Sequence, residues 1–176
     1  MIIIGALCVL FAFLYTTGPY PLSYNGWGDV LVIIFFGFVP VGGTYYVQAL
    51  TWTPDVTIAS IICGLVIDTL LVVNNYRDRE ADARSGKRTV IVRFGEKFGR
   101  YFYLLLGISA SLLCLYFLHE GHIYAALLPQ FYLVPHVLTW RRMVKIHSGK
   151  KLNSILGETS RNMLFMGILL AIGMIL

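Results

Sequence analysis

Long apolar runs alternate with short polar connections along the whole chain. Each run is apolar on all sides rather than along one stripe, which is typical of helices whose surface meets lipid or other helices. The runs cover residues 2–15, 30–50, 56–73, 101–118, 123–140 and 163–176. Since a bilayer span needs about 20 apolar residues, the pattern predicts an all-α, polytopic membrane bundle of about six transmembrane helices in a single domain, residues 1–176.

The composition agrees with this pattern. Of the 176 residues, 57% are hydrophobic and 13% are charged. A soluble domain contains about 25% charged residues, so an ordinary water-soluble fold is excluded. Cys8, Cys63 and Cys114 each lie inside an apolar run, where a free thiol behaves as a small hydrophobic side chain.

The 14 basic residues predict how the chain lies in the membrane. They fall into two connections, whereas the HEGH turn at residues 119–122 contains none. The two connections carry Arg77, Arg79, Arg84, Lys87, Arg88, Arg93, Lys97 and Arg100, and then Arg141, Arg142, Lys145, Lys150, Lys151 and Arg161. Because Lys and Arg concentrate in cytoplasmic loops, we expect both connections, and the Tyr-rich loop of residues 16–28, on the cytoplasmic side of the cell inner membrane. The placement of the basic residues behind the net charge of +5 thus orients the chain in the membrane and does not indicate nucleic-acid binding.

The residues that point to chemistry lie at the end of the third apolar run, in VVNNYRDREADARSGKRTVIVRFG, residues 72–95. Asn74, Asp78 and Asp82 are spaced by four residues, which places them on one face of a continuing helix, about 6 Å apart along its axis. Two carboxylates and an amide oxygen suit Mg²⁺, which commonly uses one or two carboxylates together with substrate phosphates. The sequence therefore predicts a magnesium site at these three residues, with Asp78 and Asp82 as the catalytic pair.

Basic side chains accompany these acids. Arg77, Lys87, Arg88 and Arg93 supply charge-assisted donors suited to a diphosphate. The alternative is that the acids only form ion pairs with neighbouring arginines at the membrane surface. The adjoining membrane helix, the paired Asn residues before the acids and the SGKRT run after them favour a metal and diphosphate site.

The same stretch resembles the UbiA-type membrane prenyltransferases, and within them the 1,4-dihydroxy-2-naphthoate polyprenyltransferases of menaquinone biosynthesis. NNYRD, EAD and SGKRTVIVRFG are similar to the second aspartate-rich motif of that family. The matching positions are Asn74, Asn75, Arg77, Asp78, Asp82, Gly86, Lys87, Thr89, Arg93 and Gly95. YTTGPYPLSYNGWGDV, FFGFVPVGGTYYVQ and LNSILGETSRNMLFMGILLAIG resemble the naphthoate branch, so the resemblance covers nearly the whole chain.

The resemblance implies an enzyme that binds a polyprenyl diphosphate through Mg²⁺ between two aspartate-rich motifs. It implies transfer of the polyprenyl group to 1,4-dihydroxy-2-naphthoate with loss of CO₂, which gives demethylmenaquinone. The substrate-binding residues are then Asn75, Arg77, Lys87, Arg88 and Arg93.

One feature departs from the family pattern. A first motif of the N-D-x-x-D type does not occur in these residues. The chain therefore resembles the C-terminal two-thirds of the family fold, the last six of about nine spans, and is N-terminally incomplete. We expect the chain alone to be inactive.

Other interpretations remain open. A prenyltransferase for another aromatic acceptor of the same family, or a non-catalytic membrane fragment, would share most of the pattern. A CDP-alcohol phosphotransferase would need a D-G-x-x-A-R run where this chain has NNYRD.

Asp68 lies inside an apolar run, where a carboxylate costs at least about 2.5 kcal/mol and is a functional candidate by default. The alternative is a structural aspartate that is neutral or paired with another helix. Asn153 resembles the branch's last-helix pattern and is equally a helix N-cap.

Overall fold

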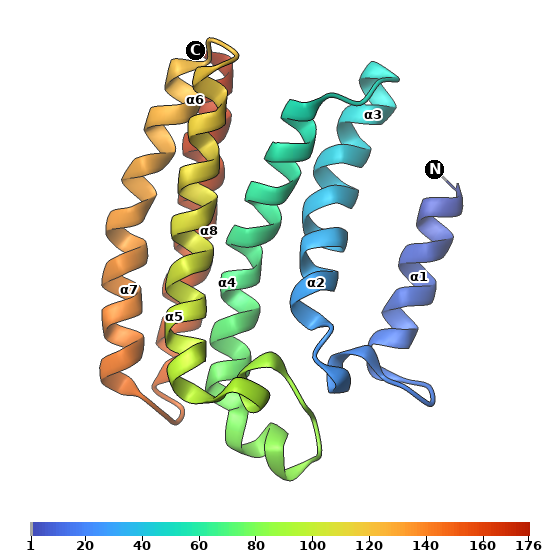
Figure 1. The fold of residues 1–176 in the computed structure, drawn as a ribbon, viewed down its shortest axis with the longest axis vertical. Coiled ribbons are helices and arrows are strands. Elements are labelled where there is room, and N and C mark those ends of the chain that lie inside the picture. Colours follow the sequence, from blue (N-terminus) through green and yellow to red (C-terminus); the bar gives the residue numbers. More distant parts are fainter. Residues whose placement is uncertain (1) are drawn as a thin grey trace.

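The computed structural model describes residues 2–176, and every regular element in that range is a helix. The helices form six elongated rods that run along the length of the bundle (Figure 1). In chain order the rods are α1 (Ile2–Thr16); α2 (Gly28–Val32), η2 (Ile33–Gly42) and α3 (Gly43–Ala49); α4 (Pro54–Arg84); α5 (Val90–Leu113) and η3 (Cys114–Leu118); α6 (Ile123–Leu127), η4 (Leu128–Tyr132) and α7 (Leu133–Ile146); and α8 (Leu152–Ile175). A short helix, η1 (Leu22–Asn25), lies between the first two rods. The predicted all-α bundle is confirmed.

Four of the rods are long and apolar enough to cross a membrane. They are Gly28–Ala49, Pro54–Arg84, Val90–Leu118 and Leu152–Ile175. The other two predicted spans correspond to α1, a shorter apolar helix, and to the rod from α6 to α7.

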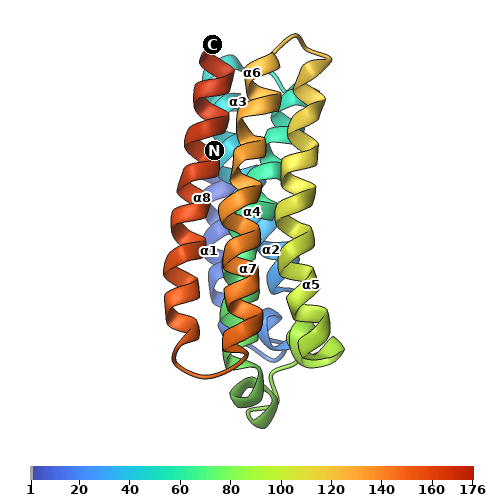
Figure 2. The same ribbon diagram turned by 90° about the vertical axis from the view of Figure 1, so that its left-hand side faces the viewer.

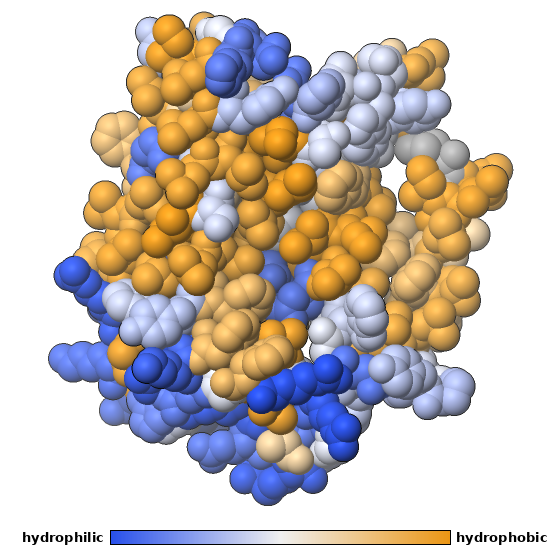
Figure 3. Space-filling model, viewed as in Figure 1, coloured by the Kyte–Doolittle hydropathy of each residue, from blue (hydrophilic) through white to orange (hydrophobic). Residues whose placement is uncertain are grey.

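One end of the bundle is hydrophilic. Figure 3 shows hydrophobic side chains over most of its height and hydrophilic ones gathered at the end where α4 joins α5 and α7 joins α8. We call this the basic end. Arg77 in the first basic connection contacts Asn153, which follows Lys150 and Lys151 of the second, so both connections meet there, as the charge pattern predicts.

α4 is longer than a bilayer is thick. Its 31 residues extend about 46 Å, whereas the hydrocarbon layer of a bilayer is about 30 Å thick. The apolar run of residues 56–73 fits inside that layer. The charged turns that follow, from Asn74 to Arg84, therefore extend past it at the basic end.

Two helices begin earlier than their apolar runs. α5 begins at Val90 and α8 at Leu152, whereas the runs begin at residues 101 and 163. The added turns are polar and lie at the basic end, so hydropathy carries no signal for them. This corrects the helix limits that the apolar runs alone would give.

Close packing with η2 fixes the position of α4. A Cβ atom on Gly37 would lie 2.4 Å from the carbonyl oxygen of Ser60, and one on Gly64 would lie 2.9 Å from Cα of Ile33. Only glycine permits these approaches. On its other side α4 packs against α5 and α8, and α5, α7 and α8 cover that part of the bundle (Figure 2). α1 by contrast buries none of its residues.

The connection between α4 and α5 is a tight turn. Gly86 has a φ of +76°, which favours glycine, and directs the chain back after Arg84. Thr89 then caps α5, because its Oγ1 accepts a hydrogen bond from the Val92 amide at 3.3 Å. At Gly95, with a φ of +86°, α5 is interrupted. The turn places the basic residues of this connection beside the last turns of α4.

Candidate metal and diphosphate site

The three predicted metal ligands lie on the unbroken last turns of α4, so the expected shared face is present. The Asp78 side chain is 38% exposed and that of Asp82 is 13% exposed. Together with Asn74 they offer oxygen donors only, which is the chemistry of a Mg²⁺ site. Among residues 2–176 there is no group of three or more His, Cys, Asp or Glu side chains able to hold a metal. A hard cation bound here would therefore take its other ligands from water or phosphate, as Mg²⁺ usually does.

Arg77 is the centre of the polar contacts on this face. Its Nε and Nη2 atoms donate to the two carboxylate oxygens of Asp78 at 2.8 and 2.6 Å. Nη2 also donates to Oδ1 of Asn74 at 2.7 Å, and Nη1 donates to Oδ1 of Asn153 at 3.0 Å. The hydrogen bonds from Arg77 lower the pKa of Asp78 below its ordinary value, although partial burial opposes them. Asp78 is therefore a charged carboxylate held by a guanidinium.

Lys87 makes the second acid–base pair. Its Nζ lies 3.2 and 3.4 Å from the two carboxylate oxygens of Asp82. The Lys87 amide also donates to the carbonyl oxygen of Asp82 at 2.9 Å, which closes the turn around Gly86. Two carboxylates and two basic groups are thus neighbours at the end of α4.

Arg88 and Arg93 join the α4–α5 turn to the loop of residues 16–28. The Arg88 amide donates to the Tyr24 carbonyl oxygen at 2.8 Å. Arg93 donates from Nη2 to the Asn25 carbonyl oxygen at 2.7 Å and from Nε to the Arg88 carbonyl oxygen at 3.1 Å. In this structure Arg93 ties two loops together, and its guanidinium forms no ion pair with an acid of the described chain.

Asn75 lies apart from the other predicted substrate-binding residues. It is one residue beyond Asn74 and therefore turned by about 100° around the helix. Only 4% of it is exposed. The structure thus brings Asn74, Arg77, Asp78, Asp82 and Lys87 together and leaves Asn75 on an inner face.

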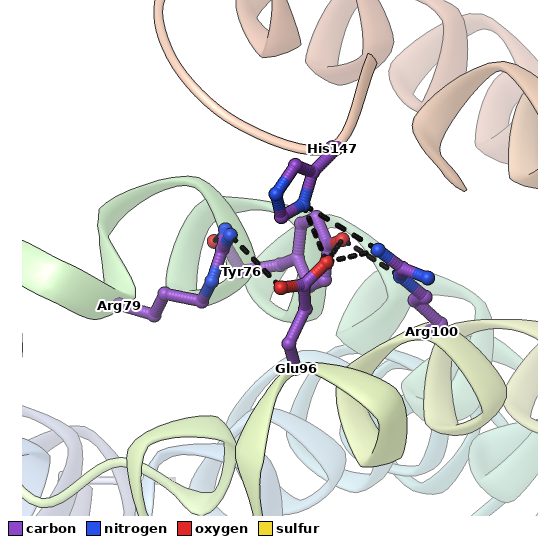
Figure 4. Close-up of polar contacts among 5 residues, drawn as sticks. All are labelled: Tyr76, Arg79, Glu96, Arg100 and His147. Atoms are coloured by element: carbon purple, nitrogen blue, oxygen red, sulfur yellow. Dashed lines mark hydrogen bonds and ion pairs between the residues drawn. The ribbon is translucent and has the colours of Figure 1, made fainter. Parts of the chain in front are cut away.

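A second polar cluster on another face of α4 was not predicted from the sequence. Figure 4 shows the Glu96 carboxylate enclosed by Tyr76, Arg79, Arg100 and His147. Glu96 accepts hydrogen bonds from Tyr76 Oη at 2.8 Å, from Arg79 Nη2 at 3.3 Å and from Arg100, and His147 Nδ1 lies 2.6 Å away. The i, i+4 spacing of Glu96 and Arg100 is its only sequence signal. The cluster fastens α4 and α5 to the α7–α8 connection.

Asn153 is the other residue that sequence reasoning did not assign to the site. It lies 76 positions after Arg77, and its type alone equally fits a helix N-cap. In the structure its side chain oxygen completes the Arg77 contacts from the first turn of α8. The site is thus built from two helices.

Two apolar cavities adjoin α4 above the site. The first, which we call the α4–α8 groove, has a volume of about 520 Å³ and includes Cys63, Ile67, Ser160 and Met163. The second, the α1–α2 cavity, has a volume of about 510 Å³ and lies between α1, the second rod and α4. Ile67 lies two helical turns before Asn74, about 10 Å along α4, so the groove leads toward the acidic face.

The model of the UbiA prenyltransferase family matches residues 1–174. The chain belongs to this family. The family resemblance inferred from the aspartate-rich stretch is therefore confirmed.

Several UbiA relatives carry names that indicate a prenyltransferase. The chain is 40% identical over 114 residues to the 1,4-dihydroxy-2-naphthoate octaprenyltransferase of Escherichia coli, which covers 65% of this chain and 37% of that protein. It is 40% identical over 113 residues to the enzyme of the same name from Mycobacterium tuberculosis, which covers 64% of this chain and 39% of that protein. The UbiA prenyltransferase domain-containing protein 1 of Dictyostelium discoideum is 29% identical over 173 residues, 98% of this chain and 51% of that protein.

The matches span between 37% and 51% of the length of these three UbiA relatives. No solved structure matches the chain. The family of the chain and its helical membrane architecture are thus established.

Proposed function

We propose that this chain forms part of a Mg²⁺-dependent prenyltransferase that acts on a polyprenyl diphosphate and 1,4-dihydroxy-2-naphthoate, with loss of CO₂, in menaquinone biosynthesis. The observation that carries the proposal is the pairing of two acids on one face of α4 with bases beside them, Arg77 with Asp78 and Lys87 of the following turn with Asp82. The printed names of the relatives from Escherichia coli and Mycobacterium tuberculosis support the naphthoate acceptor.

The acids and the bases have separate roles in this proposal. Asn74, Asp78 and Asp82 would hold the cation through oxygen atoms, and Arg77 and Lys87 would turn from these acids to the phosphate oxygens. Guanidinium and ammonium groups suit phosphate because they form charge-assisted hydrogen bonds. Mg²⁺, when bound, would supply charge neutralisation for the departing diphosphate.

The α4–α8 groove is the place that we assign to the polyprenyl tail. Its lining is almost entirely apolar, including Ile67, Met163 and Leu164. A hydrocarbon tail that lies in it stays in an apolar environment, as it does among the lipid chains. Its diphosphate end would then reach the acidic face at Asn74, about two helical turns away.

Binding of geranylgeranyl diphosphate by the chain in lipid nanodiscs tests the donor site. We expect Mg²⁺-dependent binding that weakens at least about tenfold in Asp78→Asn and in Asp82→Asn, because each removes a charged ligand. Asp55→Asn, at the other end of the same helix, is the matched control and should bind as the unchanged protein does. Binding that needs neither Mg²⁺ nor Asp78 would contradict the proposal.

Transfer itself is tested in membranes that contain the chain together with the part of the Escherichia coli relative that it does not match. We expect a labelled prenyl group to appear in a naphthoate product that has lost its carboxylate, and Asp78→Ala to abolish it. A labelled product that contains another ring would show that the acceptor is a different aromatic compound and not the naphthoate. No labelled product from any acceptor would favour a non-catalytic fragment.

A further inference from the structure

Asp68 has an unusual environment in this bundle. It is 0% exposed, and both of its carboxylate oxygens lack a hydrogen-bond partner. Within residues 2–176, every other fully buried side-chain nitrogen or oxygen atom has such a partner. Buried polar groups are nearly always hydrogen-bonded, because desolvation without a partner is costly. The interhelical pairing that would make Asp68 a structural aspartate is therefore not present, and the missing partner needs an explanation.

A second acid lies beside it. Asp29 belongs to the first turn of the rod that begins at Gly28, and this turn packs on α4 one helical turn after Asp68, because a Cβ on Gly28 would lie 3.2 Å from Cδ2 of Leu71. Asp29 is 8% exposed, so its carboxyl group is also buried within the bundle. Tyr15 of α1 lies on the same side, with its hydroxyl 3.4 Å from the position of a Cβ on Gly28. Three helices therefore bring polar groups to one region inside an apolar bundle.

The α1–α2 cavity lies next to these residues, although neither acid lines it. Its lining includes Tyr15, Val32, which is one turn after Asp29, and Leu71, which is one turn after Asp68. The walls are aromatic, and the rings of Phe11 and Phe35 have centroids 5.2 Å apart. A volume of about 510 Å³ is in the range of small-molecule sites, about 300 to 1,000 Å³. The cavity thus offers apolar faces for a flat ring, and the two carboxyl groups lie behind the wall that Tyr15 and Leu71 form.

We propose that Asp29 and Asp68 form the polar end of the acceptor site and bind the ring hydroxyl groups of an aromatic substrate held in the α1–α2 cavity. The inference rests on the proposed function, since it assigns the acceptor of that reaction. A ring hydroxyl donates to Asp29, and Asp68 gains the partner that it lacks.

α1 provides the access that this binding requires. Asp68 is covered in the structure, and Tyr15 stands beside the pair, with its hydroxyl 3.4 Å from the position that a Cβ on Gly28 would occupy. Because no residue of α1 belongs to either buried core cluster, the half-buried Tyr15 ring can shift while those clusters stay packed. The ring then reaches the acids from the cavity side.

The test compares two ligands that differ only in the groups the acids would bind. Affinities for 1,4-dihydroxy-2-naphthoate and 2-naphthoate are measured by fluorescence titration of the nanodisc-embedded protein without oxygen. We expect the hydroxylated ring to bind at least about tenfold more tightly, as for one hydrogen bond to a charged group. Asp29→Ala and Asp68→Leu should reduce this preference to less than about twofold and leave 2-naphthoate binding unchanged.

Two further variants separate polar recognition from folding. Asp68→Asn keeps a hydrogen-bonding side chain and should retain part of the preference, and Asp55→Asn should retain all of it. Mg²⁺-dependent binding of geranylgeranyl diphosphate, measured on each variant, reports that the protein is folded. It also tests the donor site independently of the acceptor.

The possible results separate the two proposals. A full preference for the hydroxylated ring in both Asp29→Ala and Asp68→Leu would overturn the acceptor site and leave Asp68 as a structural acid. A protein that binds the diphosphate and neither naphthoate, or both naphthoates equally, would overturn it as well, while the donor site stands. Loss of diphosphate binding in the unchanged protein, with the hydroxyl preference intact, would instead overturn the donor half of the proposed function.

Discussion

Arg77 and Asn153 are 76 positions apart in the chain and are joined by a hydrogen bond of 3.0 Å. The same guanidinium holds both carboxylate oxygens of Asp78. The first turn of α8 is therefore part of the acidic site, and the orientation of Arg77 depends on a residue outside the aspartate-rich stretch.

Asn153→Ala should weaken Mg²⁺-dependent diphosphate binding by about threefold to tenfold, because it removes one acceptor that orients Arg77. Ser154→Ala is the control, since Ser154 bonds only to the carbonyl oxygen of Lys151. Titration calorimetry measures the diphosphate affinity of both variants. Equal affinities of Asn153→Ala and Ser154→Ala would mean that Asn153 acts only as a residue of the helix N-terminus.

Arg77→Ala should raise the pH at which Asp78 takes up a proton. Arg77 lowers the pKa of Asp78, so the pair stabilises the fold above the ordinary aspartate pKa and this contribution is lost as the pH falls through the lowered value. Without the guanidinium the pKa returns toward its ordinary range. Carbon NMR of labelled aspartate follows the titration, with Arg84→Ala as the control, and an unchanged Asp78 midpoint would contradict the prediction.

Glu96→Ala should destabilise the fold by about 1–2 kcal/mol, because it leaves several donors without their acceptor at a partly exposed position. Its cluster lies on a different face of α4 from Asp78, so diphosphate affinity should not change. Thermal unfolding and titration calorimetry are measured together, with Glu120→Ala in the exposed HEGH turn as the control. A parallel loss of affinity would show that the two faces of α4 are coupled.

Arg93→Ala should loosen the loop of residues 16–28, because it removes the bond from Nη2 to the Asn25 carbonyl oxygen. Limited proteolysis of this loop should accelerate. Diphosphate affinity should fall less than in Lys87→Ala, whose ammonium group lies among the acids. A larger fall in Arg93→Ala would support the role in diphosphate binding that the sequence predicts for Arg93.

Gly107→Ala should destabilise the fold by about 1–3 kcal/mol through overpacking. A Cβ atom there would lie within 3 Å of three atoms of the His136 ring. That ring is stacked between Tyr103 and Tyr132, with centroids 4.6 and 5.0 Å away, so it has little room to move. Gly157→Ala, where nothing lies within 4 Å, is the control and should stabilise α8 slightly by its helix propensity. Thermal unfolding compares them, and equal melting temperatures would contradict the prediction.

The sequence predicted what depends on local periodicity. The apolar runs predict the helical bundle, and the spacing of Asn74, Asp78 and Asp82 predicts their shared face because α4 continues as one helix. Contacts between distant segments leave no such trace, so neither Asn153 beside Arg77 nor Glu96 beneath His147 could be placed. Hydropathy also gives no signal outside the apolar runs. The polar first turns of α5 and α8, which precede their runs, are therefore absent from the predicted spans.

The α4–α8 groove has exposed side chains on its rim, including Leu164 and Ile168. A groove with such a rim can be entered sideways from the surrounding lipid. A polyprenyl donor would then arrive by lateral diffusion within the bilayer and would never cross water. Occupancy of the site would follow the number of donor molecules per lipid rather than their concentration in the whole suspension. Fusion with empty vesicles would then lower the occupancy, whereas dilution with buffer would leave it unchanged.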